Sequence, residues 1–186
     1  MGVGDAVRRR AAFLDRDGVI NRAFVRDRKP FPPADISQLE VLPGVPEALG
    51  RLKAAGFLSI VVTNQPDVAR GTMARPAVEA INERLRGTLA LVALYTCWHD
   101  DMDRCACRKP LPGLLLEAAR EHDIDLARSF MVGDRWRDIA AGRAAGCRTA
   151  WISCGYDEPA PSPPADFTGS SLAEAVNWIL QTKGKQ

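Results

Sequence analysis

The chain lacks any long hydrophobic run. None of its segments approaches the roughly 18 consecutive apolar residues that identify a membrane-spanning helix. Residues Met1 to Asp5 also lack the apolar stretch of a secretion signal. The chain also lacks an excess of charge of either sign, because 25 Lys and Arg are balanced by 23 Asp and Glu. No strong electrostatic field therefore favours binding to a membrane surface. We therefore expect a cytoplasmic protein with no membrane partner.

Aromatic side chains are also scarce, at 6% of residues. A groove for nucleic acid strands needs a basic lining and stacking aromatics, so a nucleic acid partner is not expected. The sequence contains no internal repeat, and 46% hydrophobic residues suffice for one core. We expect a monomer with a single domain over residues 1–186. Its core would span about 11–154, followed by a Pro-rich connection at 155–168 and a C-terminal helix at about 171–180.

Short apolar runs alternate with segments of helical periodicity. Buried strands are expected at 11–14, 57–62, 91–95, 130–132 and 148–152. Helices are expected from Pro43 to Ala54, from Pro76 onward, and at 112–121, 136–145 and 171–180, with an irregular stretch at 21–38. This order is typical of the α/β class, a three-layer Rossmann-like parallel sheet with helices on both faces. No insertion is long enough for a large cap domain, so an open site is expected.

Several polar residues stand where these expected strands end or where a helix begins. In parallel sheets, ligands bind at the carboxyl ends of the strands, which share one edge. Removing a phosphate through an aspartyl intermediate needs a carboxylate nucleophile, a second carboxylate for proton transfer, phosphoryl-binding groups, a lysine and an acidic cradle for a cation. The residues with this chemistry are Asp15, Asp17, Thr63, Asn64, Lys109 and Asp134, with Asp138 one helical turn further on. The pattern predicts a phosphoryl-transfer site.

Cysteine is concentrated in one short region. Cys97 and His99 form a CxH pair, and Cys105 and Cys107 form a CxC pair five residues after His99. Three thiolates and one imidazole match a closed structural zinc site, although the spacing is tighter than in common zinc fingers. The alternative, free or disulfide-linked cysteines, is disfavoured in a cytosolic chain.

Four motifs resemble the haloacid dehalogenase (HAD) superfamily of phosphatases: FLDRDG at 13–18, VTNQ at 62–65, CRKP at 107–110 and MVGDR at 131–135. The CxH and CxC pairs directly before Arg108 resemble the branch that contains heptose-bisphosphate and histidinol-phosphate phosphatases. The resemblance covers about residues 11–151. Pro66 and Asp67 depart from it, because the branch usually has Ser-Gly there.

The resemblance implies a role for each matching residue. Asp15 would be the nucleophile and Asp17 the acid and base, Thr63 and Asn64 would bind phosphoryl oxygens, and Lys109 would bridge nucleophile and phosphate. Mg²⁺ would be held by Asp15, the backbone carbonyl of Asp17 and Asp134, with Asp138 supporting. Zn²⁺ would be held by Cys97, His99, Cys105 and Cys107, and would fix the segment that carries Arg108 and Lys109.

The resemblance also implies a small phosphorylated substrate. Gln65, Arg70 and Arg108 would face it, because Arg recognises phosphate through a bidentate fork. Heptose bisphosphate is the leading candidate, and histidinol phosphate or another sugar or alcohol phosphate is the alternative. A catalytically inactive zinc-stabilised binding module is a further alternative. Such a module would be expected to have lost Asp15 or Asp17, and both are present.

Overall fold

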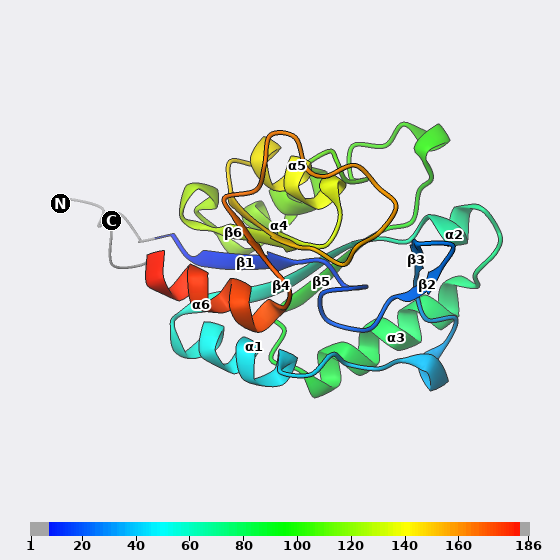
Figure 1. Cartoon of the computed structure of the whole chain (residues 1–186), viewed down its shortest axis with the longest axis horizontal. Coiled ribbons are helices and arrows are strands. Elements are labelled where there is room, and N and C mark those ends of the chain that lie inside the picture. Colours follow the sequence, from blue (N-terminus) through cyan, green and yellow to red (C-terminus); the bar gives the residue numbers. More distant parts are fainter. Residues whose placement is uncertain (1–7, 183–186) are drawn as a thin grey trace.

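The computed structural model describes residues 8–182, so the expectation about Met1 to Asp5 lies outside the described part. A six-stranded sheet forms its centre, in the order β5-β4-β1-β6-β7-β8, with every pair of neighbours parallel. The strands are β1 (Arg10–Leu14), β4 (Phe57–Asn64), β5 (Ala93–Cys97), β6 (Phe130–Gly133), β7 (Arg148–Ile152) and β8 (Phe167–Gly169). The parallel α/β fold expected from the sequence is confirmed (Figure 1).

The central strand β1 explains why this sheet needs helices on both faces. Residues 11–14 are fully buried, so both faces of the strand are covered. Phe13 is in register with Ile60 of β4 on one side and with Met131 of β6 on the other. These three side chains therefore belong to one core, on the same face of the sheet.

Helices cover the two faces of the sheet (Figure 1). One face packs against α1 (Val45–Ala54), α3 (Arg75–Thr88) and α6 (Leu172–Thr182), and the other against α4 (Gly113–His122) and α5 (Trp136–Ala144). Side chains of β1 alternate between the two cores, since Leu14 joins the first and Phe13 the second.

None of the helices in residues 8–182 is both long and apolar enough to cross a bilayer.

Several elements differ from the sequence-based expectation. The stretch expected to be irregular contains an antiparallel hairpin, β2 (Phe24–Arg26) and β3 (Lys29–Phe31). A short helix, α2 (Pro66–Ala69), follows β4, and β8 begins at the end of the Pro-rich connection. The third long strand begins two residues later than expected, at Ala93, and ends at Cys97. Short 3₁₀ helices occupy Ile36–Gln38, Asp101–Asp103 and Leu126–Arg128.

The strand order places a topological switch point beside β1. From β1 the chain continues on one side to β4 and β5, and later on the other side to β6, β7 and β8. In doubly wound sheets the crevice at this point, beyond the carboxyl ends of the strands, is where ligands bind.

Candidate active site

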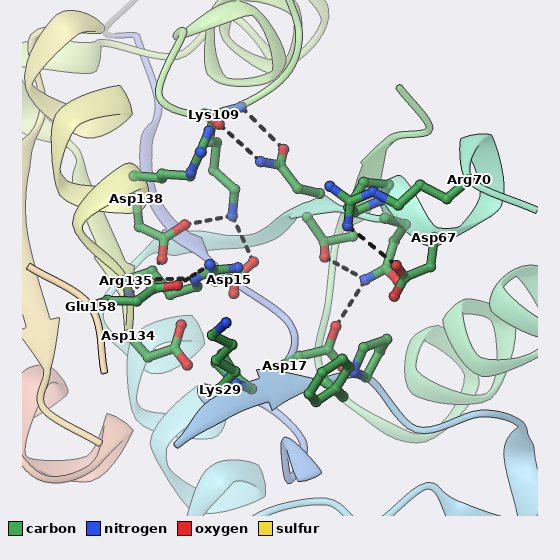
Figure 2. A pocket seen from close by; sticks show the side chains of 18 of the residues that line it. Asp15, Asp17, Lys29, Asp67, Arg70, Lys109, Asp134, Arg135, Asp138 and Glu158 are labelled. Atoms are coloured by element: carbon green, nitrogen blue, oxygen red, sulfur yellow. Dashed lines mark hydrogen bonds and ion pairs between the residues drawn. The ribbon is translucent and has the colours of Figure 1, made fainter. Parts of the chain in front are cut away.

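A pocket of about 380 Å³ lies at this edge of the sheet, a volume typical of small-molecule sites. Its floor comes from the ends of β1, β4 and β6, which contribute Asp15, Thr63 and Asp134. Lys109 and Asp138 join them from the segment before α4 and from the first turn of α5 (Figure 2). The structure therefore brings together the residues that the sequence assigned to chemistry.

Lys109 lies at the centre of the floor and is 2% exposed. Its Nζ donates to Asp15 Oδ1 at 2.6 Å and to the Val62 carbonyl at 2.8 Å, and it lies 2.6 Å from Asp138 Oδ1. Burial alone would lower the pKa of Lys109, but the carboxylates of Asp138 and Asp15 raise it above its ordinary value. The ammonium therefore stays charged and fixes one oxygen of Asp15 (Figure 2).

Asp134 has the geometry of a cation ligand. Its two carboxylate oxygens are buried, and neither has a hydrogen-bond partner of normal geometry in the described chain. Oxygens of Asp15, Asp134 and Asp138 lie within 4.8 Å of one another. Burial and these neighbouring charges raise the pKa of Asp134 well above its ordinary value. A cation with oxygen ligands relieves this repulsion and reverses the pKa shift, so the set fits a divalent ion.

Gly18 keeps space open beside this cluster. It adopts a left-handed backbone at φ +90°, and a Cβ there would lie 1.9 Å from Asp134 Oδ2.

Burial raises the pKa of Asp15 to about 6. The positive charge of Lys109 opposes this rise, and the negative charges of Asp138 and Asp17 add to it. A bound divalent cation would favour the ionised carboxylate, which is the nucleophilic form.

Asp17 is held by residues that sequence reasoning did not assign to the site. The fully buried Arg16 donates to both carboxylate oxygens of Asp17 at 3.0–3.3 Å, and Asn21 Nδ2 donates to Oδ1 at 2.9 Å. Gln65 Nε2 donates to Asp17 Oδ2 at 2.8 Å and to Thr63 Oγ1 at 2.9 Å. Gln65 was expected to face the substrate. It borders the pocket, yet its amide nitrogen is engaged with Asp17 and Thr63.

Asn64 bonds to the main chain of the catalytic segment. Its Nδ2 donates to the Lys109 carbonyl at 3.0 Å, and its Oδ1 accepts from the Lys109 amide at 3.1 Å. The expectation for Asn64 was direct contact with phosphoryl oxygens, whereas its side chain here fixes the position of Lys109. Thr63 and Asn64 both belong to β4, which extends two residues beyond the expected strand.

The Cys97, His99, Cys105 and Cys107 side chains converge at the end of β5, all ligand atoms lying within 4.8 Å of one another. Sulfur–sulfur distances are 3.2–3.7 Å, and His99 Nδ1 lies 3.3 Å from Cys107 Sγ and 3.7 Å from Cys97 Sγ. Tetrahedral Zn–S bonds of about 2.3 Å separate neighbouring ligands by about 3.8 Å. The Cys₃His set therefore fits a tetrahedral zinc ion.

The two arginines expected to bind substrate are paired with carboxylates. Arg70 lines the pocket and is bound in a fork by Asp100, at 2.6 and 2.8 Å. Arg108 donates to Asp101 at 2.8 Å, its side chain is 11% exposed, and it is not among the residues that line the pocket. Each guanidinium therefore has part of its charge and some of its donors already engaged by a carboxylate.

The pocket is less open than the absence of a cap domain suggested. The β2–β3 hairpin and the segment after β7 both reach its rim, and contribute Lys29 and Glu158 (Figure 2). Glu158 forms an ion pair with Arg135, with Arg135 Nε donating to Glu158 Oε2 at 3.0 Å. At the neighbouring position, the Asp157 amide donates to the Arg28 carbonyl at the hairpin turn, at 2.9 Å.

Comparison with known proteins agrees with this geometry. A model of the HAD-hydrolase-like family matches residues 106–175. The D-glycero-beta-D-manno-heptose-1,7-bisphosphate 7-phosphatase of Helicobacter pylori J99 is 35% identical, with 91% of this chain and 97% of the relative covered. Its namesake from Escherichia coli K12 is 36% identical, with 91% and 93% covered. A crystal structure of a heptose bisphosphate phosphatase from B. bronchiseptica, complexed with magnesium and phosphate, is 32% identical with a TM-score of 0.77, covering 92% of this chain and 98% of that one.

The fold and site therefore define the class of protein: the chain belongs to the HAD family of phosphatases. Within that family, the relatives compared above are phosphatases of heptose 1,7-bisphosphate, and this chain is similar to them over nearly its whole length.

Proposed function

We propose that this chain removes the 7-phosphate of D-glycero-D-manno-heptose 1,7-bisphosphate through a phosphoryl-Asp15 intermediate. One observation carries the proposal. Asp15 is buried at the end of β1 with one oxygen bound to Lys109 and a cation cradle beside it, in a pocket of small-molecule size. Relatives that carry this activity in their names support the choice of substrate.

In this mechanism the free oxygen of Asp15 attacks phosphorus while the bond to the sugar oxygen breaks. Asp17 supplies the proton that the leaving oxygen needs, and then takes a proton from the water that hydrolyses the intermediate. Arg16, Asn21 and Gln65 hold the Asp17 carboxylate in a fixed direction between these steps. Lys109 offsets the charge of Asp15 and of the incoming phosphate.

Asp15 and Asp134 would hold Mg²⁺, with the Asp17 carbonyl as the further ligand that the family resemblance implies. The orphaned oxygens of Asp134 support this assignment, and Mg²⁺ would supply electrostatic stabilisation of the phosphoryl oxygens. Asp138 would not coordinate the ion directly in this scheme, because Lys109 and the Arg135 amide engage its two carboxylate oxygens. It acts by positioning Lys109.

Zn²⁺ in the Cys₃His set would have a structural role. Four protein ligands leave no open coordination position, so the ion would not activate water. The ion would hold the segment around Lys109 in place, because Cys107 lies two residues before Lys109. The same segment is joined to the start of α4, where the Gly113 amide donates to the Ala106 carbonyl at 3.2 Å. Zinc and Asn64 would then fix the catalytic segment from two sides.

Two metals with separate roles are expected from these two ligand sets. EDTA should abolish phosphate release, and added Mg²⁺ should restore it, while the purified protein keeps about one zinc per chain by elemental analysis. Cys107→Ser should lower the zinc content and the activity together, and Cys147→Ser, which changes a cysteine outside the cluster, should change neither. Protein without zinc, prepared without strong chelators, would refute the zinc site.

The substrate assignment is tested by phosphate release from a panel of both anomers of heptose 1,7-bisphosphate, histidinol phosphate, smaller sugar phosphates and p-nitrophenyl phosphate. We expect kcat/KM for one heptose bisphosphate anomer to exceed that for every monophosphate. Arg70→Ala and Arg108→Ala should each raise KM for the bisphosphate by roughly one to two orders of magnitude, because a hydrogen bond to a charged group contributes about 1.5–3 kcal/mol. A tenfold preference for histidinol phosphate would overturn the assignment.

A further inference from the structure

The pocket lining carries more negative than positive charge, although the proposed substrate is a polyanion. Seven carboxylates line the pocket, against five cationic side chains. Four of those cations already have carboxylate partners: Arg70 with Asp100, Lys109 with Asp15 and Asp138, Arg135 with Glu158, and Arg137 with Asp101. A second phosphate in this pocket is therefore attracted most strongly by a cation that no carboxylate already neutralises.

Lys29 is that cation. It lines the pocket, and within residues 8–182 no ion pair or hydrogen bond engages its ammonium. It is exposed, whereas Asp15, Lys109 and Asp134 on the floor are buried, so it lies at the mouth of the pocket. Figure 2 shows its side chain directed from β3 into the pocket.

The hairpin gives Lys29 a defined position. Arg26 and Lys29 are the last opposed pair of the β2–β3 ladder, so the turn between them is only Asp27 and Arg28. Both turn residues have positive φ, 49° and 58°, as a tight two-residue hairpin turn requires. The bond from the Asp157 amide to the Arg28 carbonyl joins the turn to the segment that bears Glu158. Lys29 is thus presented by a strand that is tied at its tip.

We propose that Lys29 binds the phosphate that remains on the substrate, and so selects bisphosphates over monophosphates. This inference rests on the proposed function. In the proposed function Lys109, Thr63 and the cation cradle serve the phosphate that Asp15 attacks, whereas Arg70 and Arg108 have charge already balanced by Asp100 and Asp101 and so attract the remote phosphate less strongly. Lys29 can bind it without breaking an existing ion pair, and an ammonium suits a phosphate as a point charge.

The test compares Lys29→Ala and Lys29→Arg with the matched control Arg28→Asn. The control removes the neighbouring positive charge of the same turn, does not line the pocket, and uses a residue that tolerates positive φ. Lys29→Ala should lower kcat/KM for heptose 1,7-bisphosphate roughly tenfold, chiefly through KM, and should leave p-nitrophenyl phosphate within about twofold. Lys29→Arg should keep most of the preference, and Arg28→Asn all of it.

Binding is measured separately in an Asp15→Asn background, where calorimetry with heptose 1,7-bisphosphate should show roughly tenfold weaker binding when Lys29→Ala is added. A wild-type preference for bisphosphate that survives Lys29→Ala would overturn the inference and leave the proposed function standing. Equal losses on both substrates would also overturn it, because a remote phosphate contact cannot affect a monophosphate. A wild-type enzyme without bisphosphate preference would overturn the proposed substrate and this inference together.

Discussion

Asp15→Asn is expected to reduce turnover of every phosphate ester to below roughly 1% of wild type, because the attacking oxygen is replaced by an amide. The fold should persist. The substitution removes one of three neighbouring buried carboxylates, and Lys109 keeps Asp138 as its partner. Phosphate release under saturating substrate measures the loss, and thermal unfolding monitors the fold.

Asp123→Asn is the matched control for that change. It makes the same substitution at an exposed carboxylate that ends α4 with positive φ, a conformation that Asn tolerates. Its activity should equal that of wild type. If purified Asp15→Asn retained more than a few per cent of activity, the nucleophile would have to be another group.

Lys109→Met is expected to damage stability and catalysis together. The change leaves the buried Asp15 and Asp138 carboxylates without their shared cation, and removing one partner of a buried ion pair typically costs about 3–5 kcal/mol. Loss of the charge that faces the transferring phosphate should lower kcat by about 10²–10³. Chemical denaturation and steady-state kinetics measure the two effects. Lys53→Ala, at an exposed position of α1, should change neither.

The double variant Lys109→Met with Asp138→Asn separates these two effects. Neutralising Asp138 removes one of the carboxylates that the first change leaves unpaired, so much of the lost stability should return. Activity should stay low, because Asp15 still lacks its counter-charge. If the second substitution restored activity as well, Lys109 would be a folding residue without a role in catalysis.

The sequence predicted the strand-end residues well, because a buried parallel strand is a continuous apolar run that ends abruptly at a polar residue. Asp15 after residues 11–14 and Asp134 after residues 130–133 follow this pattern. Sheet topology then places both at one edge, so their proximity could be inferred without coordinates. The Cys₃His set was equally accessible, since its members lie within eleven consecutive residues.

Other features depend on tertiary contacts that no local pattern records. The β2–β3 hairpin has only three residues in each strand, with Pro30 inside one of them and charges at its turn, so its composition favoured a loop. Asn64 and Gln65 were identified correctly as pocket residues, but their hydrogen-bond partners depend on side-chain direction. Arg16 was hidden for the same reason, since a charged residue is rarely expected to be fully buried.

The order of strands in the sheet also determines when during folding the pocket can exist. Asp15 and Lys109 are 94 positions apart in the chain, and Asp134 comes from the opposite half of the sheet. Such non-local pairings form only after large loops close, which slows folding. A nascent chain that ends just before α4 contains the nucleophile and the cysteine cluster but no β6 beside β1. Recovered enzymatic activity during refolding therefore reports that strands from both halves of the sheet, β4 and β6, have assembled beside β1.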